Sequence, residues 1–107
     1  MVRVGAVSVN VGVFVEISGL RDDREQAGMT TLLTEVVRAE RLDDEVFVSM
    51  RGVGDDLAVR ADSGDHKVIF AGFFRWQEDF EQRVTARATR LVPHARVRFG
   101  WEYEDEF

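Results

Sequence analysis

The chain of 107 residues contains no cysteine and only two histidines, His66 and His94. Without cysteine it cannot form a disulfide or a thiolate metal site, and it has no cysteine nucleophile. A metal site built from several histidines would require more than one copy of the chain. We therefore expect a protein that holds neither a metal ion nor another cofactor.

Long apolar runs are also missing from the sequence. None reaches the roughly 18 residues that a membrane-spanning helix needs. The valine-rich segment 2–17 comes nearest, but polar residues and glycine interrupt it at alternate positions. The core of a secretion signal is continuously apolar instead. These absences predict a cytoplasmic protein that does not bind membranes.

Familiar catalytic motifs are absent as well. The sequence has no nucleophile elbow, phosphate-binding loop, dinucleotide fingerprint or zinc-protease motif. Its pairs of adjacent aspartates fall at predicted ends of helices and strands, where capping and turn formation explain them. A catalytic base at His94 would need an orienting partner, and none is near in the sequence. We expect that the protein is not an enzyme.

Basic residues are fewer than acidic residues, 14 against 20. The formal net charge is −6 and the isoelectric point is near 4.9. Nucleic-acid binding requires a basic surface, so direct binding to nucleic acid is disfavoured. An acidic protein can instead attract a basic protein partner.

What the sequence does contain is regular hydrophobic patterning. Apolar residues alternate through 7–17, which predicts a strand. Asp22 and Glu25 have the spacing of a helix capping box, and an apolar stripe follows, which predicts a helix over about 24–41. The stripe consists of Met29, Leu32, Leu33, Val36 and Val37.

Shorter segments follow that helix. Alternation predicts strands at 46–50, 57–61 and 66–72, separated by turn signals at 51–56 and 62–65. We interpret these strands as a meander of two consecutive hairpins. Helical spacing from Phe73 to Leu91 predicts a second helix ended by Pro93. A last strand is expected at 96–103, followed by a free tail.

These elements predict one α+β domain over residues 1–107. Their order is β-α-β-β-β-α-β, with a mostly antiparallel sheet and two helices packed on one face. If the first and last strands are central, the arrangement approaches a ferredoxin-like plan with one added strand.

The end of the chain, FGWEYEDEF, alternates aromatic and acidic residues. The apolar residues of the last strand should face the helices, so its acids should point to the open face of the sheet. The first strand would add an aromatic and an acid to that face if the two strands are adjacent. Aromatic side chains among carboxylates suit recognition of a basic protein. The candidate partner-binding residues are Phe14, Glu16, Trp101, Glu102, Tyr103, Glu104, Asp105 and Glu106.

Residues 66–107 include two stretches, HKVIFAGFFRWQEDF and VPHARVRFGWEYEDEF, whose order of elements and residue types resembles that of a known class of proteins. A strand ends in Gly72 and enters a helix, and a final strand leads into an acidic end. In this respect the chain resembles small acidic immunity proteins of bacterial polymorphic toxin systems, of the Immunity protein 7 type. The resemblance implies a protein that binds a cognate toxin, often a nuclease or deaminase, and blocks its active site.

The leading hypothesis is therefore an inhibitor that binds a basic toxin domain through an acidic, aromatic sheet face. Trp101 and Tyr103 could belong to the core instead of the interface. The alternative is a dimeric ferredoxin-like domain that binds or converts a small molecule in a pocket between sheet and helices, using His94, Asn10 and Trp101. A structural subunit that assembles through an edge strand is a third possibility. We expect a monomer or a weak homodimer.

Overall fold

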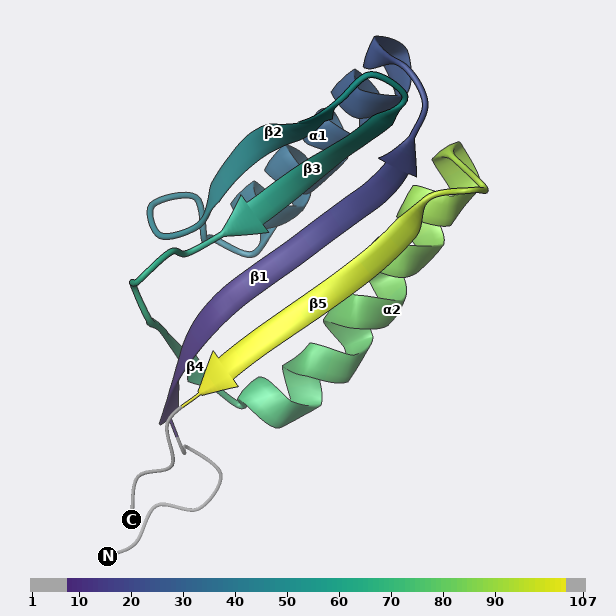
Figure 1. The fold of residues 1–107 in the computed structure, drawn as a ribbon. Coiled ribbons are helices and arrows are strands. Elements are labelled where there is room, and N and C mark those ends of the chain that lie inside the picture. The colour runs from purple at the N-terminus through teal and green to yellow at the C-terminus, as the bar shows by residue number, and fades with distance from the viewer. Residues whose placement is uncertain (1–7, 104–107) are drawn as a thin grey trace, which may run out of the picture.

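A computed structural model of the chain describes residues 8–103 and shows an α+β fold with the predicted order of elements (Figure 1). The elements are β1 (Ser8–Leu20), α1 (Asp23–Ala39), β2 (Phe47–Val53), β3 (Asp56–Asp62), β4 (Val68–Ala71), α2 (Phe73–Leu91) and β5 (Arg96–Tyr103). Every strand pair in this part of the chain is antiparallel, and both helices lie on one side of the sheet. The predicted fold class is confirmed.

The first helix begins where the capping pattern predicts. The carboxylate of Asp22 accepts a hydrogen bond from the backbone N–H of Glu25 at 2.9 Å. The Glu25 carboxylate reaches back to the N–H of Arg21 at 2.8 Å. Two of the N–H groups around the start of the helix are thereby satisfied, which fixes the turn between β1 and α1.

β1 is the centre of the sheet. On one side it pairs with β5 from Val11 to Ser18, and on the other side it pairs with β3 and then β4. β2 pairs with β3, so the main order is β5-β1-β3-β2. This is the ferredoxin-like order with one additional short strand, β4. Within residues 8–103, β5 is an edge strand, so only the first of the two terminal strands is central.

The predicted second hairpin is wrong. β3 and β4 both pair antiparallel with β1, so the chain keeps its direction between them instead of reversing. Residues 63–67 form an outward excursion along the same edge of β1. Ser63 anchors it, because its hydroxyl accepts from the N–H of Val13 at 2.9 Å and its own N–H donates to the Val13 carbonyl at 3.0 Å. The turn residues at 62–65 therefore belong to a loop that joins two strands paired with the same edge of β1.

The helices divide the inner face of the sheet between them. α1 packs on β2 and β3, and α2 packs on β5 and β1. The buried valines and isoleucine of β1 form the floor of this layer, and the stripe of α1 from Met29 to Val37 covers one half. Among the described residues, no helix lies over the opposite face of the sheet (Figure 1).

Candidate protein-binding face

Trp101 belongs to the packed side of the sheet. It lies opposite Val13, a buried residue of β1, and its indole N–H donates to Glu81 of α2. Its ring is 5.6 Å from that of Trp76 and 5.9 Å from that of Phe80, both in edge-to-face geometry. Trp101 is therefore a partly buried member of an aromatic cluster between α2 and β5, packed against the core.

The other predicted site residues fall into three groups. Phe14, Glu16 and Glu102 share the open face, because Phe14 pairs with Gly100 and Glu102 pairs with Gly12. Tyr103 pairs with Val11 in the strand register. Three predicted site residues, Glu104, Asp105 and Glu106, lie outside the described part of the chain.

Glu16 lies between two arginines at the middle of the open face. One carboxylate oxygen is 3.1 Å from Nη2 of Arg60 on β3, and the other is 2.8 Å from Nη2 of Arg98 on β5. The Glu16 side chain is only 13% exposed. Both guanidinium groups also lie against the Phe14 ring, at 5.0 and 5.9 Å from its centroid. These contacts combine ion pairing with cation–π attraction.

This cluster corrects the expected character of the face. The sequence predicts an acidic sheet surface, but the single carboxylate at its centre is matched by two guanidinium groups. Arg96 continues the positive charge toward the beginning of β5, opposite Ser18. Two acidic residues of the face, Asp62 and Glu102, lie nearer the other end of β1, and a third, Asp56, begins β3. Around Glu16 the open face therefore carries more positive than negative charge.

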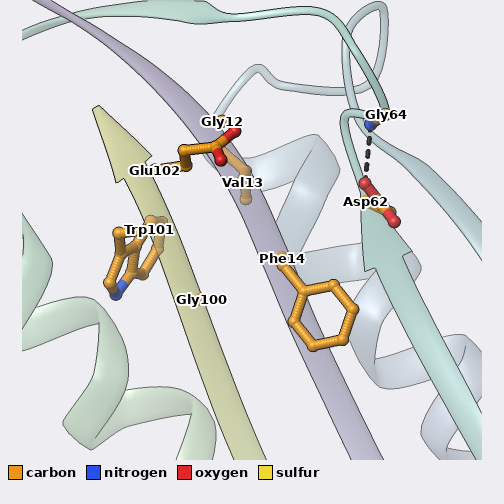
Figure 2. A pocket seen from close by; sticks show the side chains of 8 residues that line it. All are labelled: Gly12, Val13, Phe14, Asp62, Gly64, Gly100, Trp101 and Glu102. Carbon is orange, nitrogen blue, oxygen red and sulfur yellow. Dashed lines mark hydrogen bonds between the residues drawn. The ribbon is translucent and has the colours of Figure 1, made fainter. Parts of the chain in front are cut away.

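A shallow hollow occupies the acidic end of the face (Figure 2). Its volume is about 420 Å³, and Gly12 and Gly100 form part of its lining. Figure 2 shows Phe14 and Glu102 at opposite ends of it, with Asp62 on the neighbouring strand. A Cβ atom at Gly100 would lie 3.3 Å from Cβ of Phe14, a tight contact that glycine avoids. The ring of Phe14 thus covers a position that has no side chain of its own.

The two carboxylates of the hollow differ in their partners. Asp62 accepts a hydrogen bond from the N–H of Gly64 at 2.6 Å, which holds the start of the excursion after β3. Glu102 lies 2.9 Å from Nζ of Lys67, and its side chain is 86% exposed. An ion pair this exposed is weak and is easily exchanged for another cation. Glu102 is the carboxylate of the hollow that a partner can reach.

Sequence reasoning missed Arg60, Arg98 and Asp62 as parts of this face. The alternation of β3 placed Arg60 and Asp62 on a polar side, but it did not show which strand would lie beside them. The cross-strand register supplies this information, since Glu16 pairs with both Arg60 and Arg98.

The residues of the alternative pocket hypothesis do not converge. Asn10 lies opposite Ile69 near one end of β1, and Trp101 lies on the helix side. His94 precedes β5 at the other end of the sheet, beyond the pair of Ser18 with Arg96. Eight residues separate positions 10 and 18, or roughly 26 Å of strand. Within one copy of the chain, no single pocket can use all three residues.

His94 has a structural partner instead. Its Nε2 atom lies 3.0 Å from Oε1 of Glu25 at the beginning of α1. The pKa of Glu25 lies below its usual range, mainly because the carboxylate accepts the hydrogen bond from the Arg21 N–H and secondly because of His94. The contact ties the start of the helix to the loop before β5.

Within residues 8–103, no group of three or more histidine, aspartate or glutamate side chains is arranged to hold a metal ion. In the same part of the chain, neither helix has the length and apolar character needed to cross a membrane.

No known protein family and no curated protein matches this sequence. Among solved structures, the chain is similar to a de novo designed protein, Foldit4, with a TM-score of 0.60. The two share 14% sequence identity over 90% of this chain and 99% of the designed one. At this identity the likeness concerns the arrangement of helices and strands alone.

Proposed function

We propose that this chain is an immunity-type inhibitor that binds a basic toxin protein through the acidic end of its open sheet face. The observation that carries the proposal is the uncovered hollow over Gly12 and Gly100, which is bordered by Phe14, Asp62 and Glu102. An aromatic ring beside carboxylates suits a lysine or arginine side chain of a partner.

Lys67 occupies the position beside Glu102 that a cationic group of the partner would take. It is a residue of this chain that neutralises Glu102 while the face is free. A guanidinium group from the partner can replace Lys67, because a guanidinium group forms planar, bidentate hydrogen bonds with a carboxylate and an ammonium group does not. The exchange costs little at Glu102, because the side chain of Glu102 is 86% exposed and its pair with Lys67 is weak.

The sequence beyond the described residues supports the same end of the face. Glu104, Asp105 and Glu106 directly follow β5, and β5 ends beside the hollow. With a net charge of −6, these groups would accelerate the encounter with a basic protein. Affinity would then come from the hollow, where an aromatic side chain borders the bound group.

The test is affinity capture with the immobilised chain from a lysate of its native host. One variant replaces Glu102, Glu104, Asp105 and Glu106 with lysine. A matched control replaces four exposed acids away from the open-face hollow, namely Asp43, Asp44, Asp55 and Glu78, and changes the net charge equally. We expect wild type and control to retain one basic protein that the first variant loses.

Inhibition is measured next, with the captured protein in purified form. We expect its toxic or enzymatic activity to fall to background at an equimolar ratio of wild-type chain. Equal capture by both variants would remove the hollow from the proposal. A captured protein that keeps its full activity would show a binding module that is not an inhibitor.

A further inference from the structure

The outer edge of β2 is unpaired within the described part of the chain. β2 pairs with β3 along its whole length, from Phe47 with Asp62 to Val53 with Asp56, and no described strand follows on its other side. Alternate residues of such a strand direct N–H and C=O groups outward, which makes the edge a template for another strand.

This edge is also unusually apolar. Within residues 8–103, three of the six strongly exposed large apolar side chains lie on β2: Phe47 at 66%, Met50 at 57% and Val53 at 83% exposure. The strand contains no proline or lysine, the residues that commonly protect an edge. β5, the opposite edge, differs because its exposed positions include Arg96, Arg98 and Glu102.

The β2–β3 hairpin is fixed from the helix side. Gln26 of α1 is only 8% exposed, and its amide nitrogen donates to the carbonyls of Arg51 and Ala58 at 3.1 and 3.0 Å. Each carbonyl belongs to one of the two strands. The hairpin is thereby held against α1, so its edge is presented in a preformed shape and loses little entropy on binding.

We propose that β2 is the interface of a homodimer, in which it pairs antiparallel with β2 of a second copy about a two-fold axis at Met50. This register places Met50 opposite Met50 of the second copy on the helix side. On the open side it places Phe47 opposite Val53, and Ser49 opposite Arg51. The same patch serves both copies, as a closed two-fold interface requires.

Neighbouring registers are less favourable. In an antiparallel pair, directly opposite residues lie on the same face of the sheet. The helices of both copies therefore stay on one side only if the two-fold axis passes through a residue of β2. The neighbouring registers place the axis at Ser49 or at Arg51. An axis at Ser49 places Phe47 opposite Arg51 and leaves Val53 beyond the other strand. An axis at Arg51 places two arginines directly opposite each other, which is destabilising. The axis at Met50 alone matches the three exposed apolar side chains with one another.

The dimer leaves the proposed binding face accessible. A two-fold axis perpendicular to the sheet joins the two five-stranded sheets into one and keeps both open faces on the same side. Gly12 and Gly100 of the hollow lie on β1 and β5, at least two strands away from β2, and Asp62 of the hollow lies on β3, opposite Phe47 of β2. The dimer therefore leaves the β1 and β5 part of the hollow open, and Asp62 is the residue of the hollow that lies beside the interface.

A single cysteine tests the proposed register, because the natural chain has none. Facing residues of an antiparallel pair have Cα atoms about 4.5–5.5 Å apart, within the range of a disulfide. We expect Met50→Cys to form a covalent dimer nearly completely under mild oxidation. The control, Ile69→Cys, replaces an apolar residue of β4 that is 70% exposed, and it should remain mostly monomeric.

Sedimentation equilibrium tests the association itself. We expect wild type to dimerise reversibly and Met50→Glu to remain monomeric, because it places two carboxylates opposite each other. An equimolar mixture of Met50→Glu and Met50→Lys should restore a heterodimer. Wild type that remains monomeric up to roughly 1 mM, or Met50→Cys that cross-links no better than Ile69→Cys, would overturn the proposal.

Discussion

The two faces of the central sheet are built from alternate residues of the same strands, yet they are held together by different forces. On the helix side, Trp101 and Phe99 of β5 pack against Trp76 and Phe80 in a cluster of aromatic rings. On the open side, Glu16 joins two arginines on its neighbouring strands. Burial of apolar area dominates the first face, and matched charges dominate the second.

The difference matters for what each face can do. A packed aromatic layer gives stability, and its rings are buried or partly buried against one another. On the open face, ion pairs hold the polar side chains in place and no helix of the described residues covers them. The same side chains can therefore stabilise the sheet and contact a partner. This explains why the exposed hollow lies beside Phe14, whose ring is fixed between guanidinium groups and Gly100.

The largest effect should come from the helix side. Phe80 is 3% exposed, and its ring stacks on Trp76 at a centroid distance of 4.5 Å. Phe80→Ala should reduce the free energy of unfolding by about 3–5 kcal/mol, since it removes apolar contacts and leaves a cavity. Urea denaturation followed by tryptophan fluorescence measures this change.

Phe74 on the same helix provides the control, since it is 59% exposed. Phe74→Ala should cost much less than Phe80→Ala. Equal losses for the two variants would contradict the assignment of the aromatic cluster as the main support of this face.

A smaller effect is expected on the open side. Glu16→Gln preserves the shape of the side chain but removes the charge between Arg60 and Arg98. We expect a loss of about 1–3 kcal/mol, because Arg60 then remains partly buried without its counter-ion. The control is Glu35→Gln, which removes an exposed pair with Arg87 on the helices and should cost less than about 1 kcal/mol.

Thermal unfolding of both glutamine variants at low and high salt completes the test. If Glu16→Gln is no more destabilising than Glu35→Gln, the cluster around Phe14 does not support the open face.

The smallest effect should come from a charged contact that belongs to neither face. Glu25 has a lowered pKa in the folded protein because it accepts the Arg21 N–H and, secondly, pairs with His94. A carboxylate with a lowered folded pKa adds stability above its unfolded pKa of about 4.3. That contribution is lost as the pH falls through the lower folded value.

We therefore expect Glu25→Gln to reduce stability at neutral pH and to approach wild type in strong acid. Melting temperatures measured across the acid range for both proteins test this. A constant difference between them at every pH would show that the carboxylate charge contributes nothing.

Much of the fold was predictable because local periodicity determines it. The strand at 96–103 and the helix at 73–91 agree with β5 and α2, and the helix at 24–41 agrees with α1 within a few residues. The placement of Trp101 toward the helices also followed from alternation. In each case the hydrophobic period of the segment agrees with the buried face it has in the fold.

Non-local pairing was not predictable in the same way. The turn signals at 62–65 indicate a bend, but only the hydrogen bonds between Ser63 and Val13 show that the chain bends outward and continues. Likewise, the sequence shows Glu16 among apolar residues without showing that Arg60 and Arg98 flank it. The prediction of an acidic surface was wrong at the centre of the sheet, where two arginines flank Glu16. The sequence could not show this, because the pairing register of β1 with β3 and β5 decides which charges lie side by side.

The central position of β1 has a consequence for the nascent chain. β1 is synthesised before β3 and β4, so one of its edges can be completed early, whereas its other edge must wait for β5. Until then, the aromatic side of α2 lacks Phe99 and Trp101 to pack against. An open edge beside uncovered aromatic rings favours aggregation. A fragment that ends after Leu91 should therefore aggregate more readily than the chain that includes β5.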